Sequence, residues 1–272
     1  MYSERSSQST YQILNLIGQG QFGRVFRAVH SQTQEIVALK ELNQKSISTK
    51  LFLREFSFLT GLQHPNIVSC RGLEYSPTGR YLVMDYCRGG NLRELIESEN
   101  QLDSLESLKL IADILSGLEY AHNYGIVHCD LKPENILLEP QEKGWTARIS
   151  DFGIARLVGQ VNLTNISMGD TGSPAYMAPE RFYGGYSYAC DLYAIGVILF
   201  ELLVGERPFS GVFRDLRNSH LNNTITIPNT VPFLVRSTIT KSLQKLPQRR
   251  YSSASEMLKS IQLAIQVLAA ST

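Results

Sequence analysis

Three glycines near the start of the chain could bring backbone atoms close to phosphate oxygens. Gly18, Gly20 and Gly23 lie in the pattern GQGQFG, and glycine has no Cβ to stand between the backbone and a ligand. The same spacing occurs in dinucleotide-binding folds, where the last glycine opens a helix. Here the strand-like residues 25–29 follow instead. The pattern therefore favours a glycine-rich hairpin over nucleotide phosphates.

A lysine in a short apolar run is the next residue suited to phosphate chemistry. In Val37-Ala38-Leu39-Lys40, strand alternation places Ala38 and Lys40 on the same face. Ala38 is small enough to admit a flat ring, and Lys40 carries a positive charge for phosphate. The alternative is an edge strand with a solvated lysine, and the run alone leaves both interpretations open.

A glutamate sits within an apolar helical stripe. A helix is predicted over about residues 49–62, with Leu51, Leu59 and Leu62 on one face and Glu55 among them. A carboxylate on a buried face needs a partner, and the nearest unexplained cation in the sequence is Lys40. Alternatively Glu55 lies at the edge of the stripe and reaches water.

The elements that must position these residues change in character along the chain. The N-terminal third consists mostly of short segments rich in β-branched and aromatic residues, whereas later apolar residues recur at helical spacing. The clearest elements are strands at 25–29, 36–40 and 81–84 and helices at 105–118 and 191–203. We predict an α+β fold of two lobes. It comprises a disordered, Ser-rich leader (1–10), a small β-rich lobe with one helix (about 11–86), a hinge (about 85–90) and a larger, mainly α-helical lobe (about 91–268).

The composition is that of an ordinary globular protein. Apolar residues make up 43% and charged residues 19%, and the net charge of +1 gives no argument for nucleic acid or a membrane. The four cysteines are scattered without a CxxC pair, which suits a reducing cytosol. The longest apolar run, 194–204, is too short to span a bilayer. These features predict a cytoplasmic protein with no membrane span and no nucleic-acid partner.

Three further motifs follow in order along the chain. They are HCDLKPEN at 128–135, DFG at 151–153 and APE at 178–180. Together with the glycine motif, this ordered set resembles the eukaryotic-type (Hanks-type) protein kinases over about residues 11–268, and the chain is identified as a bacterial Ser/Thr member. The resemblance implies a bilobal kinase fold and transfer of the γ-phosphate of ATP to serine or threonine hydroxyls on proteins.

The resemblance also assigns catalytic roles. Lys40 is expected to hold the α- and β-phosphates and to pair with Glu55. Asp130 is expected to accept or orient the proton of the substrate hydroxyl. Lys132, two residues on, is expected to neutralise charge on the γ-phosphate.

Further residues are assigned to the metal ions and the nucleotide. Asp151 is expected to bind Mg²⁺ that bridges the phosphates and Asn135 a second ion, both through the oxygen ligands that Mg²⁺ prefers. The remaining nucleotide contacts are assigned to the three glycines over the phosphates, to Val25, Ala38 and Leu137 around adenine, to the backbone of Asp85 and Cys87 at the hinge, and to Asn91 at the ribose.

Other motif residues carry structural expectations. His128 and Phe152 are expected to be core packing residues. Glu180 and Arg250 resemble a buried ion pair that ties the activation segment to the larger lobe. Asp191 is expected to cap the buried helix and to brace the catalytic loop.

Two positions depart from the usual pattern. Cys129 replaces the arginine that normally receives an activation-loop phosphate, and Gly169 stands about where the phosphorylated residue usually lies. We therefore predict a non-RD mode, in which activity does not need phosphorylation of that loop. Cys129 is either a redox-sensitive thiol or a small buried thiol that fills the space left by the arginine.

The resemblance implies specificity for Ser/Thr over Tyr, because Lys132 and the segment 172–176 are of the Ser/Thr type. The Ser173 hydroxyl in that segment is expected to bond Asp130 and Lys132. One alternative is a pseudokinase that binds nucleotide without transfer, although Lys40, Asp130, Asn135 and Asp151 are all present. A second is a small-molecule kinase of similar fold, which the intact APE motif argues against. Partners are expected to be protein substrates, together with a regulatory partner or an autophosphorylating dimer.

Overall fold

The computed structural model describes residues 9–20, 23–41, 56–58, 60–76, 79–98, 102–152, 155–157 and 172–270 of the 272. The chain divides into two compact units, one of Met1–His64 and Val68–Cys87 and the other of Pro65–Ile67 and Arg88–Thr272. The first is rich in strands and the second is mainly helical. The predicted α+β fold of two lobes is therefore confirmed.

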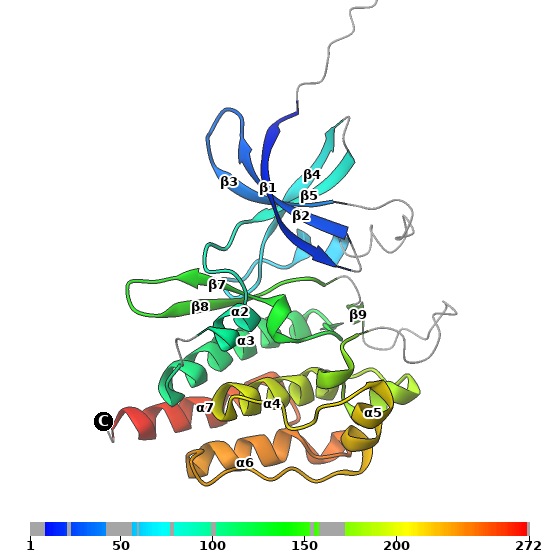
Figure 1. The fold of residues 1–272 in the computed structure, drawn as a ribbon, viewed down its shortest axis with the longest axis vertical. Coiled ribbons are helices and arrows are strands. Elements are labelled where there is room, and N and C mark those ends of the chain that lie inside the picture. The colour runs from blue at the N-terminus through cyan, green and yellow to red at the C-terminus, as the bar shows by residue number, and fades with distance from the viewer. Residues whose placement is uncertain are drawn as a thin grey trace, which may run out of the picture. The chain divides into compact units, whose positions relative to one another are not determined.

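The first unit is built on a five-stranded antiparallel sheet (Figure 1). Its strands, in the spatial order β1-β2-β3-β5-β4, are β1 (Tyr11–Gly20), β2 (Gly23–His30), β3 (Ile36–Glu41), β5 (Gly79–Asp85) and β4 (Cys70–Ser76). The strands predicted at 25–29, 36–40 and 81–84 lie within β2, β3 and β5 and are confirmed.

The two faces of β3 have different partners. Val37 and Leu39 join Ala28, Tyr81 and Val83 in a core in which no residue is more than 3% exposed. The alternating residues at positions 38 and 40 therefore share the opposite face, as predicted. Of the predicted helix over 49–62, the described residues 56–58 and 60–61 are helical. Glu55 lies outside the described residues, so its pairing with position 40 stays a prediction.

The second unit is a stack of helices with short strands at one end (Figure 1). The helices are α2 (Leu92–Glu97), α3 (Ser104–Asn123), α4 (Tyr188–Val204), α5 (Phe213–Asn222), α6 (Phe233–Ser242) and α7 (Ala254–Ala269). The strands pair as β6 (Ile126–Val127) with β9 (Arg156–Leu157) and as β7 (Ile136–Pro140) with β8 (Trp145–Ile149). Short 3-10 helices are η1 (Pro133–Asn135), η2 (Pro174–Tyr176), η3 (Pro179–Tyr183) and η4 (Pro247–Arg249).

The two predicted long helices form the centre of this unit. α3 begins at a capping box between Asp103 and Glu106 and packs against α7, α4 and β8. In α4, every residue from Cys190 to Glu201 is buried, as predicted for a segment that is apolar on nearly every side. A side chain at Gly196 would overlap Ser242, so this glycine lets α6 approach α4 closely. Across the described part of the chain, we find no helix that combines the length and the apolar character needed to cross a membrane.

Candidate active site

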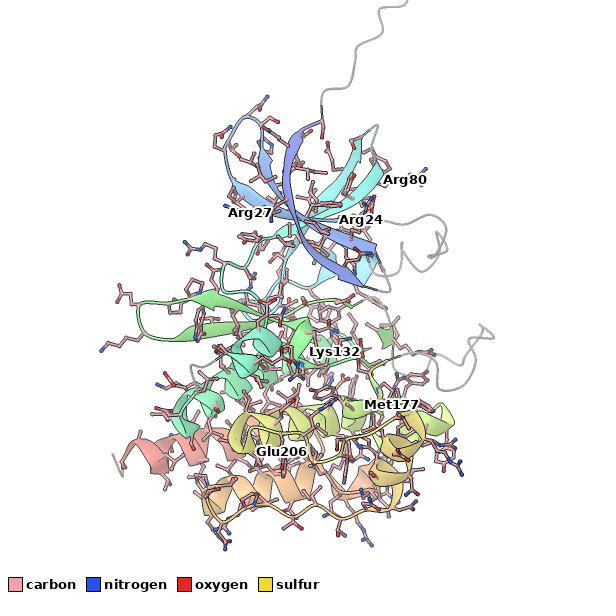
Figure 2. All side chains as sticks on the ribbon, in the orientation of Figure 1. Arg24, Arg27, Arg80, Lys132, Met177 and Glu206 are labelled. Atoms are coloured by element: carbon pink, nitrogen blue, oxygen red, sulfur yellow. The ribbon has the colours of Figure 1, made fainter. Side chains whose placement is uncertain are left out.

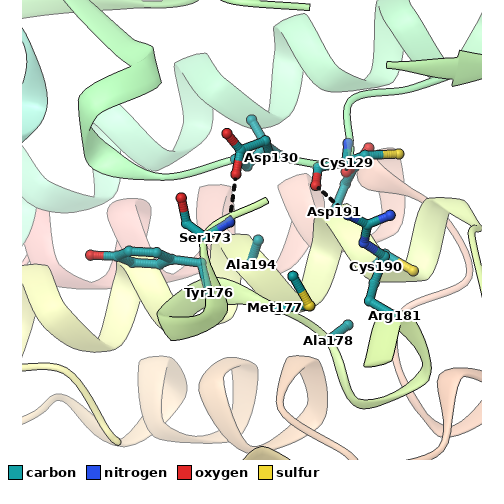
Figure 3. Close-up of a pocket in the computed structure, with 11 residues that line it drawn as sticks. Cys129, Asp130, Ser173, Tyr176, Met177, Ala178, Arg181, Cys190, Asp191 and Ala194 are labelled. Carbon is teal, nitrogen blue, oxygen red and sulfur yellow. Dashed lines mark hydrogen bonds between the residues drawn. The ribbon is translucent and has the colours of Figure 1, made fainter. Parts of the chain in front are cut away.

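The loop after β6 places a buried carboxylate among hydrogen-bond donors (Figure 3). Asp130 is 8% exposed, and its Oδ1 accepts the backbone N–H of Ser173 at 2.9 Å. Its Oδ2 lies 3.3 Å from Asn135 Nδ2 and 3.5 Å from Lys132 Nζ, whose position Figure 2 marks. These contacts bring three predicted site residues together and fix the direction of the carboxylate. The contact from Ser173 is made by its backbone N–H, whereas the sequence prediction assigned it to the hydroxyl.

Asn135 is oriented to offer an oxygen atom. Its Nδ2 donates to the backbone oxygen of Asp130 at 2.8 Å as well as to the carboxylate. Its side-chain Oδ1 is therefore the atom suited to a metal ion. The backbone N–H of Ser150 donates to the backbone oxygen of Asn135 at 2.9 Å, which ties the residue preceding Asp151 to this loop. An amide oxygen and a carboxylate fit the Mg²⁺ role that the sequence predicts. Gly153, the third residue of the DFG motif that begins at Asp151, lies outside the described residues.

A fully buried carboxylate in the first turn of α4 supports the loop. Asp191 accepts the backbone N–H groups of His128 at 2.8 Å and Cys129 at 2.9 Å, and it lies 3.0 Å from His122 Nε2. Burial alone would raise the pKa of Asp191, but these hydrogen bonds, led by that from His122, lower it. The predicted bracing of the loop is confirmed. The predicted capping is wrong, because the N-cap of α4 is Ser187.

Two other sets of motif residues have the structural roles expected of them. His128 and Phe152 are fully buried with ring centroids 4.7 Å apart, and His128 Nε2 lies 2.9 Å from the backbone oxygen of Ser150. Arg250 donates to Glu180 through two hydrogen bonds of 2.7 Å, with the arginine side chain fully buried. Such a bidentate pair fixes both position and direction.

An ionic network that the sequence prediction missed surrounds Arg93 of α2. Its guanidinium contacts Glu201 of α4 at 2.9 Å and Glu134 of η1 at 3.1 Å, and it donates to the hydroxyl of Tyr176. The Tyr176 hydroxyl in turn donates to Glu201 at 2.6 Å. Burial opposes the charge on Arg93, but the bond to Glu201 and the nearby negative charge raise its pKa. The network joins the loop that carries Asp130 to the segment that carries Ser173.

A buried histidine of α5 also contacts the segment that carries Ser173. His220 of α5 lies 3.1 Å from the backbone oxygen of Ala175 through Nε2 and 2.8 Å from the Tyr193 hydroxyl through Nδ1. Burial lowers the pKa of His220 from 6.5 to about 4, and the charge of Lys245 adds to this effect. The folded protein therefore keeps this imidazole neutral well below the pH at which the unfolded chain protonates it.

This difference predicts a loss of stability in mild acid. Above pH 6.5 both states are neutral and His220 costs nothing; as the pH falls from 6.5 toward 4, only the unfolded state gains the proton. The expected loss in the free energy of unfolding is about 3 kcal/mol. We expect melting temperature to fall less steeply over this window in His220→Gln, in which an amide can still donate to Ala175. If the melting temperatures of the wild-type protein and His220→Gln fell equally with pH, His220 would not be the group responsible for the loss of stability.

The residue before Asp130 is a buried cysteine in a left-handed conformation. Cys129 has φ 70° and is 9% exposed, and burial, with the charge of Asp191 adding, raises its pKa to about 12. A thiol that stays protonated at neutral pH is a poor nucleophile. The structure therefore favours the space-filling alternative over the redox-sensitive one.

Two arginines lie close to this cysteine. Arg181 donates to the backbone oxygen of Cys129 at 3.3 Å, and its guanidinium stacks 4.2 Å from the centroid of the Tyr186 ring. The guanidinium of Arg156 lies 3.8 Å from the same centroid. Aromatic faces stabilise nearby cations, so Tyr186 holds positive charge beside the loop.

The first unit carries the three glycines, Lys40 and two of the predicted adenine residues, Val25 and Ala38. Gly18 pairs with Val25 across β1 and β2, and Val25 pairs with Lys40 across β2 and β3. Gly20 pairs with Gly23 at the end of the same hairpin, where Gly23 has φ 133° and a Cβ would stand 2.5 Å from the backbone oxygen of residue 41. Only glycine fits there, as the hairpin interpretation requires.

Ala38 and Lys40 are buried on one face of β3, 8% and 7% exposed. Arg24 of β2, which Figure 2 labels, forms an ion pair of 2.7 Å with Glu41 of β3. A lysine this buried does not fit the alternative of a solvated edge residue. Its binding of phosphate stays a prediction.

The remaining predicted nucleotide residues have local structural roles. Asp85 ends β5 and accepts a hydrogen bond of 2.8 Å from Arg71, and Cys87 is buried two residues later. In the second unit, Asn91 forms a backbone bridge with Leu137 and caps α2, accepting from the Glu94 N–H at 3.0 Å. The ribose role of Asn91 is untested, and its capping role was missed.

Comparisons with known proteins identify the family of the chain. A family profile described as "Protein kinase domain" matches residues 11–261. The chain is 34% identical over 264 residues to serine/threonine-protein kinase PrkC of Bacillus subtilis, covering 93% of this chain and 40% of that protein. It is 31% identical over 263 residues to "Probable serine/threonine-protein kinase PknB" of Lactococcus lactis, covering 92% and 41%. It is 31% identical over 267 residues to serine/threonine-protein kinase 33 of Bos taurus, covering 92% and 54%.

The chain thus spans between two fifths and about half the length of these relatives. The match runs through both units and includes the loop around Asp130, the Asn135 amide and the Glu180–Arg250 pair described above. The family predicted from the ordered motifs is confirmed. This chain belongs to the protein kinase domain family.

Proposed function

We propose that the chain is an active serine/threonine protein kinase that transfers the γ-phosphate of ATP to protein hydroxyls. The observation that carries this proposal is the Asp130 carboxylate, held by the Ser173 N–H and Asn135 with Lys132 3.5 Å away. A carboxylate fixed in this way can receive a proton, and the adjacent ammonium can balance negative charge.

In this mechanism Asp130 accepts the proton of the acceptor hydroxyl as its oxygen bonds to the γ-phosphorus. The bond from that phosphorus to the bridging oxygen of ADP breaks, and ADP leaves with the electron pair. Lys132 neutralises charge on the phosphoryl oxygens. When bound through Asn135 and Asp151, Mg²⁺ neutralises the phosphates. Lys40, supported by Glu55, holds the α- and β-phosphates under the glycine hairpin.

The nucleotide base belongs, in this proposal, with Val25, Ala38 and Leu137, with the backbone of Asp85 and Cys87 as its hydrogen-bonding edge. Asn91 serves the ribose while it caps α2. The small side chain of Ala38 and the glycine-only position at Gly23 support a site that accepts a flat ring and a phosphate chain.

The proposal is tested with the purified chain, radiolabelled ATP, Mg²⁺ and a generic basic protein. Labelled phosphoserine and phosphothreonine without phosphotyrosine are the expected products, and EDTA should abolish labelling. A chain carrying Asp130→Asn controls for contaminating kinases. Nucleotide binding without labelling would identify a pseudokinase. Labelling of a small molecule but of no protein would identify a small-molecule kinase.

We also propose that transfer does not require phosphorylation of the residues before Gly172. Cys129 offers no charge to receive a phosphate, and the Tyr186 ring and the Cys129 carbonyl already stabilise Arg181. The candidate acceptors Thr164, Ser167 and Thr171, together with Gly169, lie outside the described residues. We expect phosphatase-treated protein, and a variant with these three acceptors changed to alanine, to keep more than half of the activity on an exogenous substrate.

A tenfold loss after phosphatase treatment that preincubation with ATP restores would sink this proposal. Mass spectrometry before and after treatment shows whether phosphate was present and removed. A mock treatment with heat-inactivated phosphatase serves as the control.

The setting we propose is cytosolic signalling in which proteins are the substrates. None of the four cysteines, all within the described residues, forms a disulfide, which suits a reducing compartment. Two of the relatives above are bacterial, which supports the bacterial type. We further propose control by a regulatory partner or by autophosphorylation in a dimer. The dimer alternative requires a rate of autophosphorylation per molecule that rises with protein concentration.

A further inference from the structure

A groove runs along α6, on a part of the second unit that the proposed active site does not use. Its volume is about 500 Å³, and its lining includes Phe233, Arg236, Lys241 and Arg249. We call it the α6 groove. It is a shallow depression that stays open to solvent.

The charges that line the α6 groove are all of one sign. Its lining residues, all within the described part of the chain, include three cations and no carboxylate. Lys241 is paired with the neighbouring Glu256 at 2.6 Å. Arg236 donates to the neutral Asn229 at 2.8 Å, and its buried Nε has no hydrogen-bond partner among the described residues. Arg249 is exposed on η4. The groove therefore keeps a local positive charge although the whole chain is nearly neutral.

An exposed aromatic ring stands at one end of these cations. Phe233 is the first residue of α6 and is 74% exposed, with the Arg236 guanidinium 5.8 Å from its ring centroid. The neutral lining residues Ser237, Thr240 and Gln244 add hydrogen-bonding groups to the groove. The groove thus combines an apolar contact, neutral polar groups and guanidinium groups from α6 and the residues that follow it to η4.

We propose that the α6 groove binds an acidic peptide segment of a partner protein. Carboxylates of the segment pair with Arg236 and Arg249, because a guanidinium presents two parallel donors to a carboxylate. One apolar side chain of the segment covers Phe233, and the neutral polar residues meet its backbone. A peptide fits better than a nucleic acid duplex or an anionic membrane, since both of those need an extended basic surface rather than a short groove with an aromatic end.

The proposal is tested by fluorescence anisotropy with a labelled twelve-residue peptide that contains five glutamates around a single leucine. The control peptide has glutamine at every glutamate position. We expect the acidic peptide to bind saturably and the glutamine peptide not to bind. Added salt should weaken the binding of the acidic peptide. The double variant Arg236→Gln, Arg249→Gln should weaken binding about tenfold. Phe233→Ala should weaken it about fivefold.

Arg214→Gln is the matched control, because it removes an exposed arginine from α5 and should leave binding unchanged. Melting curves of all variants confirm that they fold. Equal binding of the glutamine peptide, or no effect of the double variant, would overturn the proposal. The proposal would also be overturned if a labelled single-stranded RNA bound more tightly than the acidic peptide and lost this binding in the double variant. A dimer of this chain that dissociates in the double variant would overturn it as well. The assay contains no ATP, so its outcome is independent of whether the chain transfers phosphate.

Discussion

Replacing Asp130 with asparagine is expected to lower kcat about a thousandfold, within the range typical of a lost general base. Asparagine can still accept the Ser173 N–H through its single oxygen. Its amide group, however, would face Lys132 and the Asn135 Nδ2, so donors would meet donors where Oδ2 now accepts. Because Asp130 does not hold the nucleotide in the proposed mechanism, KM for ATP should change less than about threefold. Steady-state kinetics with a protein substrate measure both constants.

The matched control is Asp215→Asn, which removes an exposed carboxylate from the first turn of α5. It should leave both constants unchanged. An Asp130→Asn chain that keeps a tenth or more of the wild-type kcat would show that another group takes the proton. Melting curves separate this outcome from misfolding, since the isosteric change should shift the melting temperature by only a few degrees.

Replacing Asp191 with alanine is expected to lower the free energy of unfolding by about 3–5 kcal/mol, as for other broken buried pairs. Three buried groups would lose their acceptor: the backbone N–H groups of His128 and Cys129 and the His122 ring nitrogen. Unfolding in denaturant, monitored by circular dichroism, measures this loss. Because the two backbone groups belong to the loop that carries Asp130, activity should fall before the global transition.

Two variants make this result specific. Asp191→Asn keeps one oxygen acceptor and the same shape, so it should lose less stability than alanine does. Asp215→Ala, on the exposed surface of α5, should change stability by less than about 0.5 kcal/mol. An Asp191→Ala protein as stable as Asp215→Ala would contradict the bracing role.

Sequence periodicity predicts those helices and strands in which buried residues recur at a constant spacing or fill the whole segment. The strand at 36–40 is predictable because alternate residues meet one core, and α4 because its apolar run has no polar face. The hairpin of β7 and β8 was not predicted, since no hydrophobic period distinguishes two short strands in a mainly helical region. Motif order identified the family, but it carried no information on what each side chain contacts.

The site residues that were missed depend on contacts between distant parts of the chain. Arg93 and Glu201 lie 108 positions apart, so no local pattern links them. The capping role of Asn91 was predictable, because Asn91 and Glu94 have the spacing of a capping box just before an apolar residue. Asp191 was expected to cap its own helix because it lies near the start of α4. Its carboxylate instead turns to two backbone groups of a loop more than sixty residues earlier.

The complete burial of α4 has a consequence for how the second unit fluctuates. Amide hydrogens exchange with solvent through openings, and the smallest openings occur where a segment has an exposed face or a frayed end. The residues from Cys190 to Glu201 have no exposed face, so we expect their amides to be among the slowest to exchange in this unit. Most residues of α5 are exposed, so we expect its amides to exchange faster, through openings that break the His220 contact with Ala175. Asp191 attaches the catalytic loop to this buried helix, so we expect the amides of His128 and Cys129 to exchange more slowly than those of α5.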